Sequence, residues 1–408
     1  MGCKLTAEAV ISQLENPIQN YAWGSHSAIA HLLGHPSPSA KPEAELWMGA
    51  HPNAPSLLLP SRESLAACIE REPDRLLGAR NRASFGARLP YLLKVLAAET
   101  PLSLQAHPTL EQARAGFDAE QAAGVPLDSA QRNYKDRSHK PELLCALTPF
   151  TALCGFRPIE ATLALFRELK VAHVSYLLDI LAQRPTEAGL SQLFAALLGL
   201  SAERRGELAR ETLDRCTQLS AIEGPFQHEF TWAVSIGVLY PGDIGIVSAL
   251  LLNLVQLAPG EAIYLPAGNL HAYLQGVGVE IMANSDNVLR GGLTPKHVDP
   301  VELLRVLQFQ AAPANVLRGE VQGRMRVYRT PTSEFELSSV TLSAGESLTL
   351  DDRRGPEILF CQQGHAELAG AAERPSLRQG QALFISADEP SYTVSGEGTL
   401  FRASVGRL

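Results

Sequence analysis

Two polar residues of one strand-like run could bind a single metal ion together. Gln105 and His107 lie two positions apart within Leu102-Ser-Leu-Gln-Ala-His-Pro108. In a β-strand, residues two apart project from the same face. Glu142 opens the apolar run Glu142-Leu-Leu-Cys-Ala146, where an unpaired carboxylate would be costly unless a metal or a cation holds it. Glu142 is therefore a third candidate ligand.

A fourth candidate, His271, follows a strand and a glycine turn. Glu261 to Leu265 has the composition of a short buried strand, which begins after Pro259-Gly260 and ends before Pro266-Ala-Gly268. Such a turn would present the imidazole inward from the lip of a β-barrel. A lone histidine in a turn is more often structural, but here it completes a set of nitrogen and oxygen ligands without thiolate. This set suits zinc with an open coordination position, while Mn, Fe and Co are chemically possible.

Charged residues within apolar runs suggest further site residues. Lys94 lies in the middle of the buried run Leu89–Ala97 and either extends outward or points at a negative group. Arg137, His139 and Lys140, just before Glu142, supply positive charge, although a solvated basic turn is the alternative interpretation.

The stretch from Val277 to Lys296 is also rich in polar residues. Glu280 lies within an apolar alternation, while Asp286, Arg290 and Lys296 lie around turns. A loop with convergent polar groups flanked by glycines suits a ligand site better than a linker. Trp23, near the N-terminus, is better explained by packing on sequence grounds alone.

Periodicity predicts a mainly β chain interrupted by helices. Apolar spacing predicts helices over 64–78, 111–123 and 299–306, and a helical module of about four short helices from 158 to 223. Strand-like sequence resumes after Gly237, at Leu239–Asp243. The last ninety or so residues are again β-rich, but no histidine follows Gly380 in register, so this unit should lack a metal site and His365 should be a turn residue.

Length and composition limit the classes of function. A chain of 408 residues needs two or three domains. A net charge of -8 argues against a nucleic-acid surface and requires a local cationic cluster for any anionic substrate. Six scattered cysteines suit a reducing cytosol, and no apolar run reaches transmembrane length. The N-terminus fits the short myristoylation pattern at Gly2, with Cys3 beside it. We nevertheless expect a cytoplasmic monomer without membrane attachment, whose partners are small molecules.

Several segments resemble known families. The spacing from Gly260 through Pro266 and Gly268 to His271 resembles the second motif of the cupin superfamily, although Gln275 stands where that motif has Asn. The chain also resembles the type I phosphomannose isomerase family, in family order over most of residues 16 to 300. The matching segments are Gln19–Gly24, Glu45–Pro52, Leu102–Pro108, His139–Glu142, Pro266–His271 and Glu280–Lys296.

The resemblance implies a fold, a cofactor and an activity. It implies a cupin-type β-barrel or jelly-roll fold: a catalytic metal-binding domain over 1–157 and 236–310, a helical insertion over 158–235, and a C-terminal cupin-like domain without metal over 311–408. It implies one zinc ion per chain, held by Gln105, His107, Glu142 and His271, together with a catalytic Arg290. Members of the family interconvert mannose 6-phosphate and fructose 6-phosphate.

This reaction moves a proton between C2 and C1 through an enediolate, so it needs a base and a group that stabilises the oxyanion. We expect Arg290 to stabilise charge, and because arginine stays protonated, Glu280 and Lys140 are alternative proton carriers. Lys94 and Lys296 are candidate phosphate contacts, and Trp23, His139, Tyr273 and Asp286 are candidate pocket residues. Two rival functions are a cupin oxygenase, which would use iron on three His and a carboxylate, and a non-enzymatic sugar-phosphate-binding cupin.

Overall fold

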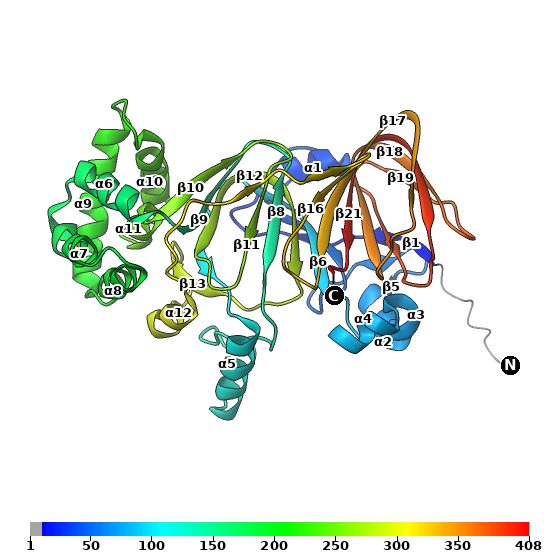
Figure 1. Ribbon diagram of the computed structural model, residues 1–408, viewed down its shortest axis with the longest axis horizontal. Helices are drawn as coiled ribbons and strands as arrows, with labels where there is room; N and C mark the ends of the chain where they lie inside the picture. Colours follow the sequence, from blue (N-terminus) through cyan, green and yellow to red (C-terminus); the bar gives the residue numbers. More distant parts are fainter. Residues whose placement is uncertain (1–9, 408) are drawn as a thin grey trace.

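Two antiparallel β units lie side by side, with helices at one end and along one side (Figure 1). The computed structural model describes residues 10–407, so Gly2 and Cys3 lie outside the described residues. Helices account for about 30% of the chain and strands for about 32%, so the expectation of a mainly β chain underestimated its helices.

The first unit is an eleven-stranded sheet system built around one long strand, β12 (His271–Ala283). The second half of β12 pairs with β6 and β8, and its first half pairs with β7 and β9. This strand therefore connects the two faces that surround the candidate ligands. The remaining strands are β2 (Ile18–Gln19), β3 (Glu45–Gly49), β6 (Tyr91–Ala98), β7 (Leu104–Ala106), β8 (Glu142–Ala146), β9 (Phe150–Phe156), β10 (Leu252–Leu257), β11 (Ala262–Leu265), β13 (Leu289–Gly292) and β14 (Val316–Leu317).

The second unit is a ten-stranded sheet that combines both ends of the described chain. Strand β1 pairs with β20 and with β4, so residues before Glu63 contribute to the C-terminal sheet. The first domain was expected to start at residue 1, so the expected limits did not assign β1 to the second unit. The strands are β1 (Ile11–Glu15), β4 (Leu57–Leu58), β5 (Glu63–Ser64), β15 (Glu320–Gln322), β16 (Met325–Tyr328), β17 (Glu336–Leu350), β18 (Glu357–Ala369), β19 (Ser376–Arg378), β20 (Ala382–Ile385) and β21 (Tyr392–Ser404).

Six consecutive helices gather at one end of the molecule, beside β9 and β10 (Figure 1). They bury a common leucine-rich core against these strands, because each presents an apolar face at helical spacing. The helices continue to Leu250, so the strand expected at Leu239–Asp243 is instead the end of α10 and a turn. They are α6 (Ile159–Leu169), α7 (Ala172–Gln183), α8 (Glu187–Leu198), α9 (Ala202–Ser220), α10 (Gln227–Leu239) and α11 (Gly245–Leu250).

The other helices lie around the β units. The helix expected over 64–78 is present but is divided at Pro73, and those expected over 111–123 and 299–306 are α5 and α12. These helices are α1 (Ala28–Leu33), α2 (Leu65–Arg71), α3 (Pro73–Leu77), α4 (Ala79–Phe85), α5 (Leu110–Ala122) and α12 (Pro300–Val306). No helix within residues 10–407 is long and apolar enough to span a bilayer.

Candidate active site

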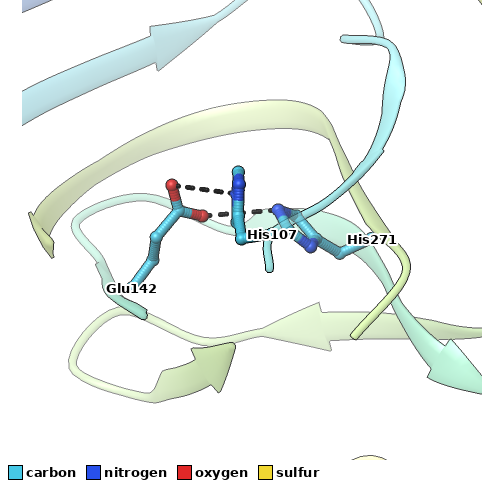
Figure 2. Close-up of side chains that lie close together, drawn as sticks. All are labelled: His107, Glu142 and His271. Atoms are coloured by element: carbon cyan, nitrogen blue, oxygen red, sulfur yellow. Dashed lines mark ion pairs between the residues drawn. The ribbon is translucent and has the colours of Figure 1, made fainter. Parts of the chain in front are cut away.

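Three buried side chains of the first unit converge on one point. His107 follows β7, Glu142 begins β8 and His271 begins β12, and their ligand atoms lie within 4.8 Å of one another. The two carboxylate oxygens of Glu142 face the two imidazoles separately, each at 3.3 Å from an Nε2 atom (Figure 2). Strand pairing brings the two histidines together, because His271 pairs with Gln105 of β7, two residues before His107.

The hydrogen bonds around the cluster orient its donor atoms for binding of a cation. His107 Nδ1 lies 2.7 Å from the carbonyl of Asn287, and His271 Nδ1 lies 3.0 Å from the carbonyl of Asn269. These contacts place the ring proton on Nδ1 and leave Nε2 as a lone-pair donor. Both Nε2 atoms and Glu142 Oε2 are buried without a hydrogen-bond partner. Orphaned buried polar atoms of this kind are costly unless a metal ion satisfies them.

The protonation states also suit metal binding. Burial lowers the pKa of His107 to about 4, so its imidazole is neutral at pH 7. Burial alone would raise the pKa of Glu142, but Lys140 and His107 hold it well below its usual range. Two imidazoles and one carboxylate are a usual ligand set for catalytic zinc.

Gln105 lies next to this cluster. It pairs with His271 on one side and with Arg290 on the other, and it lines the adjoining cavity together with Glu142. Gln105 thus borders the cavity together with Glu142, and its role as a metal ligand stays a prediction.

A cavity of about 470 Å³ opens over the cluster. Its walls come from β3, β6, β7, β12 and the segment that follows β12. Its polar and aromatic lining comprises Tyr21, Trp23, Glu45, Trp47, His51, Lys94, Ser103, Gln105, Lys140, Glu142, Tyr240, Tyr273, Glu280, Ser285, Asp286, Arg290, Thr294 and Lys296.

One wall carries a buried network of alternating charges. Lys94 Nζ lies 3.1 Å from Glu280 Oε2 and 3.6 Å from Glu45 Oε1. Tyr273 donates its hydroxyl hydrogen to Glu280 at 2.7 Å, and Trp47 Nε1 donates to Glu45 at 2.6 Å. Residues 47, 94 and 280 are direct neighbours across β3, β6 and β12, which is why their side chains share one face.

This network sets the acidity of its members. Burial, together with Glu142 and Glu45, raises the pKa of Glu280, and Lys94 opposes this shift. Burial would lower the pKa of Lys94, but Glu45 and Glu280 outweigh it and raise that pKa, so the ammonium stays charged. Lys94 is thus held between two carboxylates, a position that does not suit the phosphate contact expected for it.

Two cations of the cavity have no such partners. Neither the guanidinium of Arg290 nor the ammonium of Lys296 makes a hydrogen bond or ion pair with any residue from 10 to 407. Burial lowers the pKa of Arg290, and burial and Arg290 together lower the pKa of Lys296. Their positive charges remain available to an anionic ligand.

Most of the other predicted residues border the same cavity. Trp23 stacks on Tyr21 with ring centroids 5.7 Å apart. Lys140 lines the cavity and lies 2.7 Å from Glu142, and Asp286 lies 3.3 Å from His51. His139 is the exception, because it does not line the cavity and its Nε2 lies 2.7 Å from Glu334. Since adjacent side chains of a segment entering a strand project in opposite directions, Lys140 points into the cavity and His139 away from it.

The prediction missed Glu45, His51 and Ser285. Glu45 carried the same signal as Lys94, a charge within the apolar run Ala44-Glu-Leu-Trp-Met48. His51 and Ser285 carried no comparable signal, since both lie beside turns where polar residues are ordinary.

Comparison with known proteins agrees with this geometry. Residues 11–159 match the family of phosphomannose isomerase type I catalytic domains, and residues 324–405 match the mannose-6-phosphate isomerase cupin domain. The chain is 42% identical to mannose-6-phosphate isomerase of Escherichia coli over 96% of its length and 99% of the relative's. It is 33% identical to the human mannose-6-phosphate isomerase, covering 91% of this chain and 92% of that protein.

Solved structures give the same result. The crystal structure of mannose 6-phosphate isomerase from Salmonella typhimurium bound to fructose 6-phosphate and zinc superimposes with a TM-score of 0.88 at 41% identity. It covers 98% of this chain and 100% of the Salmonella chain. A zinc-bound structure of mannose 6-phosphate isomerase also has a TM-score of 0.88, at 40% identity, with the same coverage.

Proposed function

The chain belongs to the type I phosphomannose isomerase family, and from this premise we propose that it interconverts mannose 6-phosphate and fructose 6-phosphate with one zinc ion. His107, Glu142 and His271 would hold the ion, with Gln105 as the fourth protein ligand. The buried Nε2 atoms without partners support this assignment. A zinc ion bound there supplies Lewis acidity toward the sugar's carbonyl and hydroxyl oxygens.

The observation that carries the proposal is the pair of unpaired cations, Arg290 and Lys296, in the cavity that Gln105 and Glu142 also line. We assign the phosphate of the substrate to Lys296, with Arg290 between the phosphate-proximal oxygens and the reacting carbons. A guanidinium at that position stabilises the negative charge that develops on the enediolate oxygen. Fixing the phosphate also orients C1 and C2 toward the opposite wall of the cavity.

Glu280 is the proton carrier that the electrostatics favour. A raised pKa brings a carboxylate closer to the working pH, which improves it as a base that removes the C2 proton and returns it to C1. Tyr273 and Lys94 orient its two oxygens. Lys140, which contacts Glu142, is the other candidate, and we assign it the task of positioning that carboxylate.

The remaining assignments are proposals of the same kind. We propose that helices α6–α11 form an insertion between the halves of the metal-binding domain, that residues 311–408 form a cupin-like domain without metal, and that the protein works as a cytoplasmic monomer. The cysteines Cys145, Cys154, Cys216 and Cys361 are buried and free, in agreement with a reducing compartment.

A coupled assay with mannose 6-phosphate tests the function directly. The purified protein should turn over mannose 6-phosphate, lose this activity after complete chelation of bound metal, and regain it with one equivalent of zinc per chain. Absence of turnover in the zinc-loaded protein, or full turnover after the metal has been removed, would refute the proposal. Oxygen consumption by an iron-loaded protein would instead favour the oxygenase, although the described cluster has two histidines rather than three.

A further inference from the structure

A second cavity, of about 240 Å³, adjoins the segments that border the active site. Its walls come from the end of α4, the following segment up to Pro90, the first turns of α5 and residues 333–334. Two further walls, at Ser138-His139 and Ala283-Asn284, immediately precede Lys140 and Ser285, which line the catalytic cavity.

Positive charge exceeds negative charge in this second cavity. Arg88 and Arg114 line it, and both are exposed. Arg88 Nε donates only to the carbonyl of Phe85, at 3.1 Å, and the guanidinium of Arg114 makes no hydrogen bond or ion pair within residues 10–407. The single carboxylate, Glu334, already faces His139 at 2.7 Å. Because the whole chain has a net charge of -8, two guanidinium groups with free donors form an unusual local site, and their planar donors suit phosphate.

The cavity also offers partners for hydroxyl groups. Asn284 lines it, and the side-chain oxygen of this residue is buried without a hydrogen-bond partner. Ser84 and Ser333 lie in the same lining. A volume of about 240 Å³ lies just below the range of roughly 300–1,000 Å³ that holds drug-sized ligands, so a smaller molecule fits.

The two chain segments that border both cavities, 138–140 and 283–285, are linked by hydrogen bonds. Ser138 accepts hydrogen bonds at its carbonyl from Ser285 Oγ at 3.2 Å and from Asn287 Nδ2 at 2.8 Å. Asn287 in turn presents its own carbonyl to the metal-site residue His107. An anion in the second cavity would compete with Glu334 for the His139 ring. A shift of His139 toward the anion would displace the adjacent Lys140.

We propose that this second cavity is a non-catalytic binding site for a small polyhydroxylated phosphate, a sugar phosphate in chemical class, whose occupancy lowers turnover at the active site. The binding part of this inference is independent of the proposed function. Only its effect on turnover rests on that function.

Glucose 1-phosphate is a suitable probe, because its phosphate blocks the carbon that would have to open for isomerisation. Calorimetric titration of the zinc-loaded full chain should detect two sites per chain, one catalytic and one in the second cavity. The double variant Arg88→Ala/Arg114→Ala should retain one site. A matched variant, Arg374→Ala/Arg378→Ala, removes two exposed arginines from the second β unit and should retain both sites.

Kinetics supply the second measurement. At saturating mannose 6-phosphate, glucose 1-phosphate should lower kcat of the wild type at least twofold and leave kcat of the Arg88/Arg114 double variant unchanged. Equal numbers of sites in the wild type and the double variant, or purely competitive inhibition of the wild type, would each overturn the proposal. If the protein lacks isomerase activity altogether, the number of calorimetric sites still decides whether the second cavity binds the probe.

Discussion

At the scale of single residues, the active site separates cations that are paired from cations that are free. Lys94 contacts two carboxylates and Lys140 contacts a third, whereas Arg290 and Lys296 have no acidic partner within residues 10–407. A cation that is paired with a carboxylate changes the pKa of that carboxylate, whereas an unpaired cation can stabilise negative charge on the substrate. The different positions of these four residues in the network therefore imply different consequences of mutation.

Arg290→Ala should remove charge stabilisation without disturbing the metal. Loss of one preorganised donor to an oxyanion typically lowers kcat by about 10²–10³. Removal of the whole guanidinium should lower kcat by at least this factor. Zinc content, measured on the purified variant, should remain one per chain. His271→Ala is the matched comparison, because it should lose zinc together with activity. An Arg290→Ala enzyme with wild-type kcat would contradict the assignment.

Glu45→Gln should change the pH dependence of catalysis. Glu45 raises the pKa of Glu280, so removal of its charge should lower that pKa. If Glu280 acts as a base, activity is lost as pH falls through its pKa, and the acid limb of the kcat profile should therefore move to lower pH. The glutamine can still accept from Trp47 Nε1, which keeps the fold of this wall. An acid limb that stays in place or moves to higher pH would exclude this coupling.

At the scale of elements, strand β12 changes its pairing partners between His271 at its start and Glu280 near its end. Gly276 lies between these two halves with φ of +129°, and a Cβ there would lie 2.6 Å from the Phe150 ring and 2.8 Å from the Pro149 carbonyl. Only glycine combines this backbone conformation with this close approach. His271 contacts Glu142, which lines the same cavity as Glu280, although His271 and Glu280 lie nine positions apart.

Gly276→Ala should therefore lower the free energy of unfolding by more than the strained backbone conformation alone would. A strained φ costs about 1–3 kcal/mol, and the collisions with Phe150 and Pro149 should add to it. Gly260→Ala is the control, because this glycine also has positive φ, +84°, but a Cβ at this position would have no neighbouring atom within 4 Å. Urea unfolding should show the larger loss of stability for Gly276→Ala, accompanied by lower activity. Equal losses of stability for the two variants would mean that the close contacts of the new Cβ with Phe150 and Pro149 do not contribute.

The elements also explain what could be predicted from sequence. Strands β6, β8 and β11 and helices α5 and α12 were predicted because each has a local pattern and clear turn residues at its ends. The end of α10 was misassigned because Val238 and Leu239 have the composition of a strand. Both are exposed, and the helix is held by the buried Phe230, Ala233 and Ile236 of its preceding turns. The candidate ligands His107, Glu142 and His271 lie together, whereas Glu45 was overlooked despite a comparable signal.

At the scale of the whole molecule, the two β units share one hydrophobic core. Leu46, Val95 and Ile281 of the first unit belong to the same buried cluster as Phe360 and Phe401 of the second. Tyr91 of β6 also donates its hydroxyl hydrogen to the carbonyls of Pro356 and Ala403, at 3.0 and 3.2 Å. No local pattern could have predicted that β1 pairs with β20, since the two strands are separated by more than 360 residues. Such a shared core favours unfolding of both units in one transition.

Glu357→Leu tests whether the two β units unfold together, because Glu357 lies in the second unit and the metal cluster in the first. Glu357 is fully buried and accepts from Arg402 at 2.6 and 2.9 Å and from Tyr392 at 2.7 Å. Removal of one partner from a buried ion pair costs about 3–5 kcal/mol, and Arg402 would then retain a 3.3 Å contact with the exposed Asp352. Urea unfolding followed by tryptophan fluorescence should show this loss, although Trp23, Trp47 and Trp232 all lie outside the second unit.

The control is Glu346→Leu, which removes the partner of Arg324 in an exposed pair and should cost no more than about 1 kcal/mol. Circular dichroism, which reports both β units, should give the same transition midpoint as fluorescence for each variant. If Glu357→Leu shifts the transition seen by circular dichroism and leaves the tryptophan transition in place, the units unfold separately. In that case the shared core does not transmit stability from the C-terminal sheet to the active site.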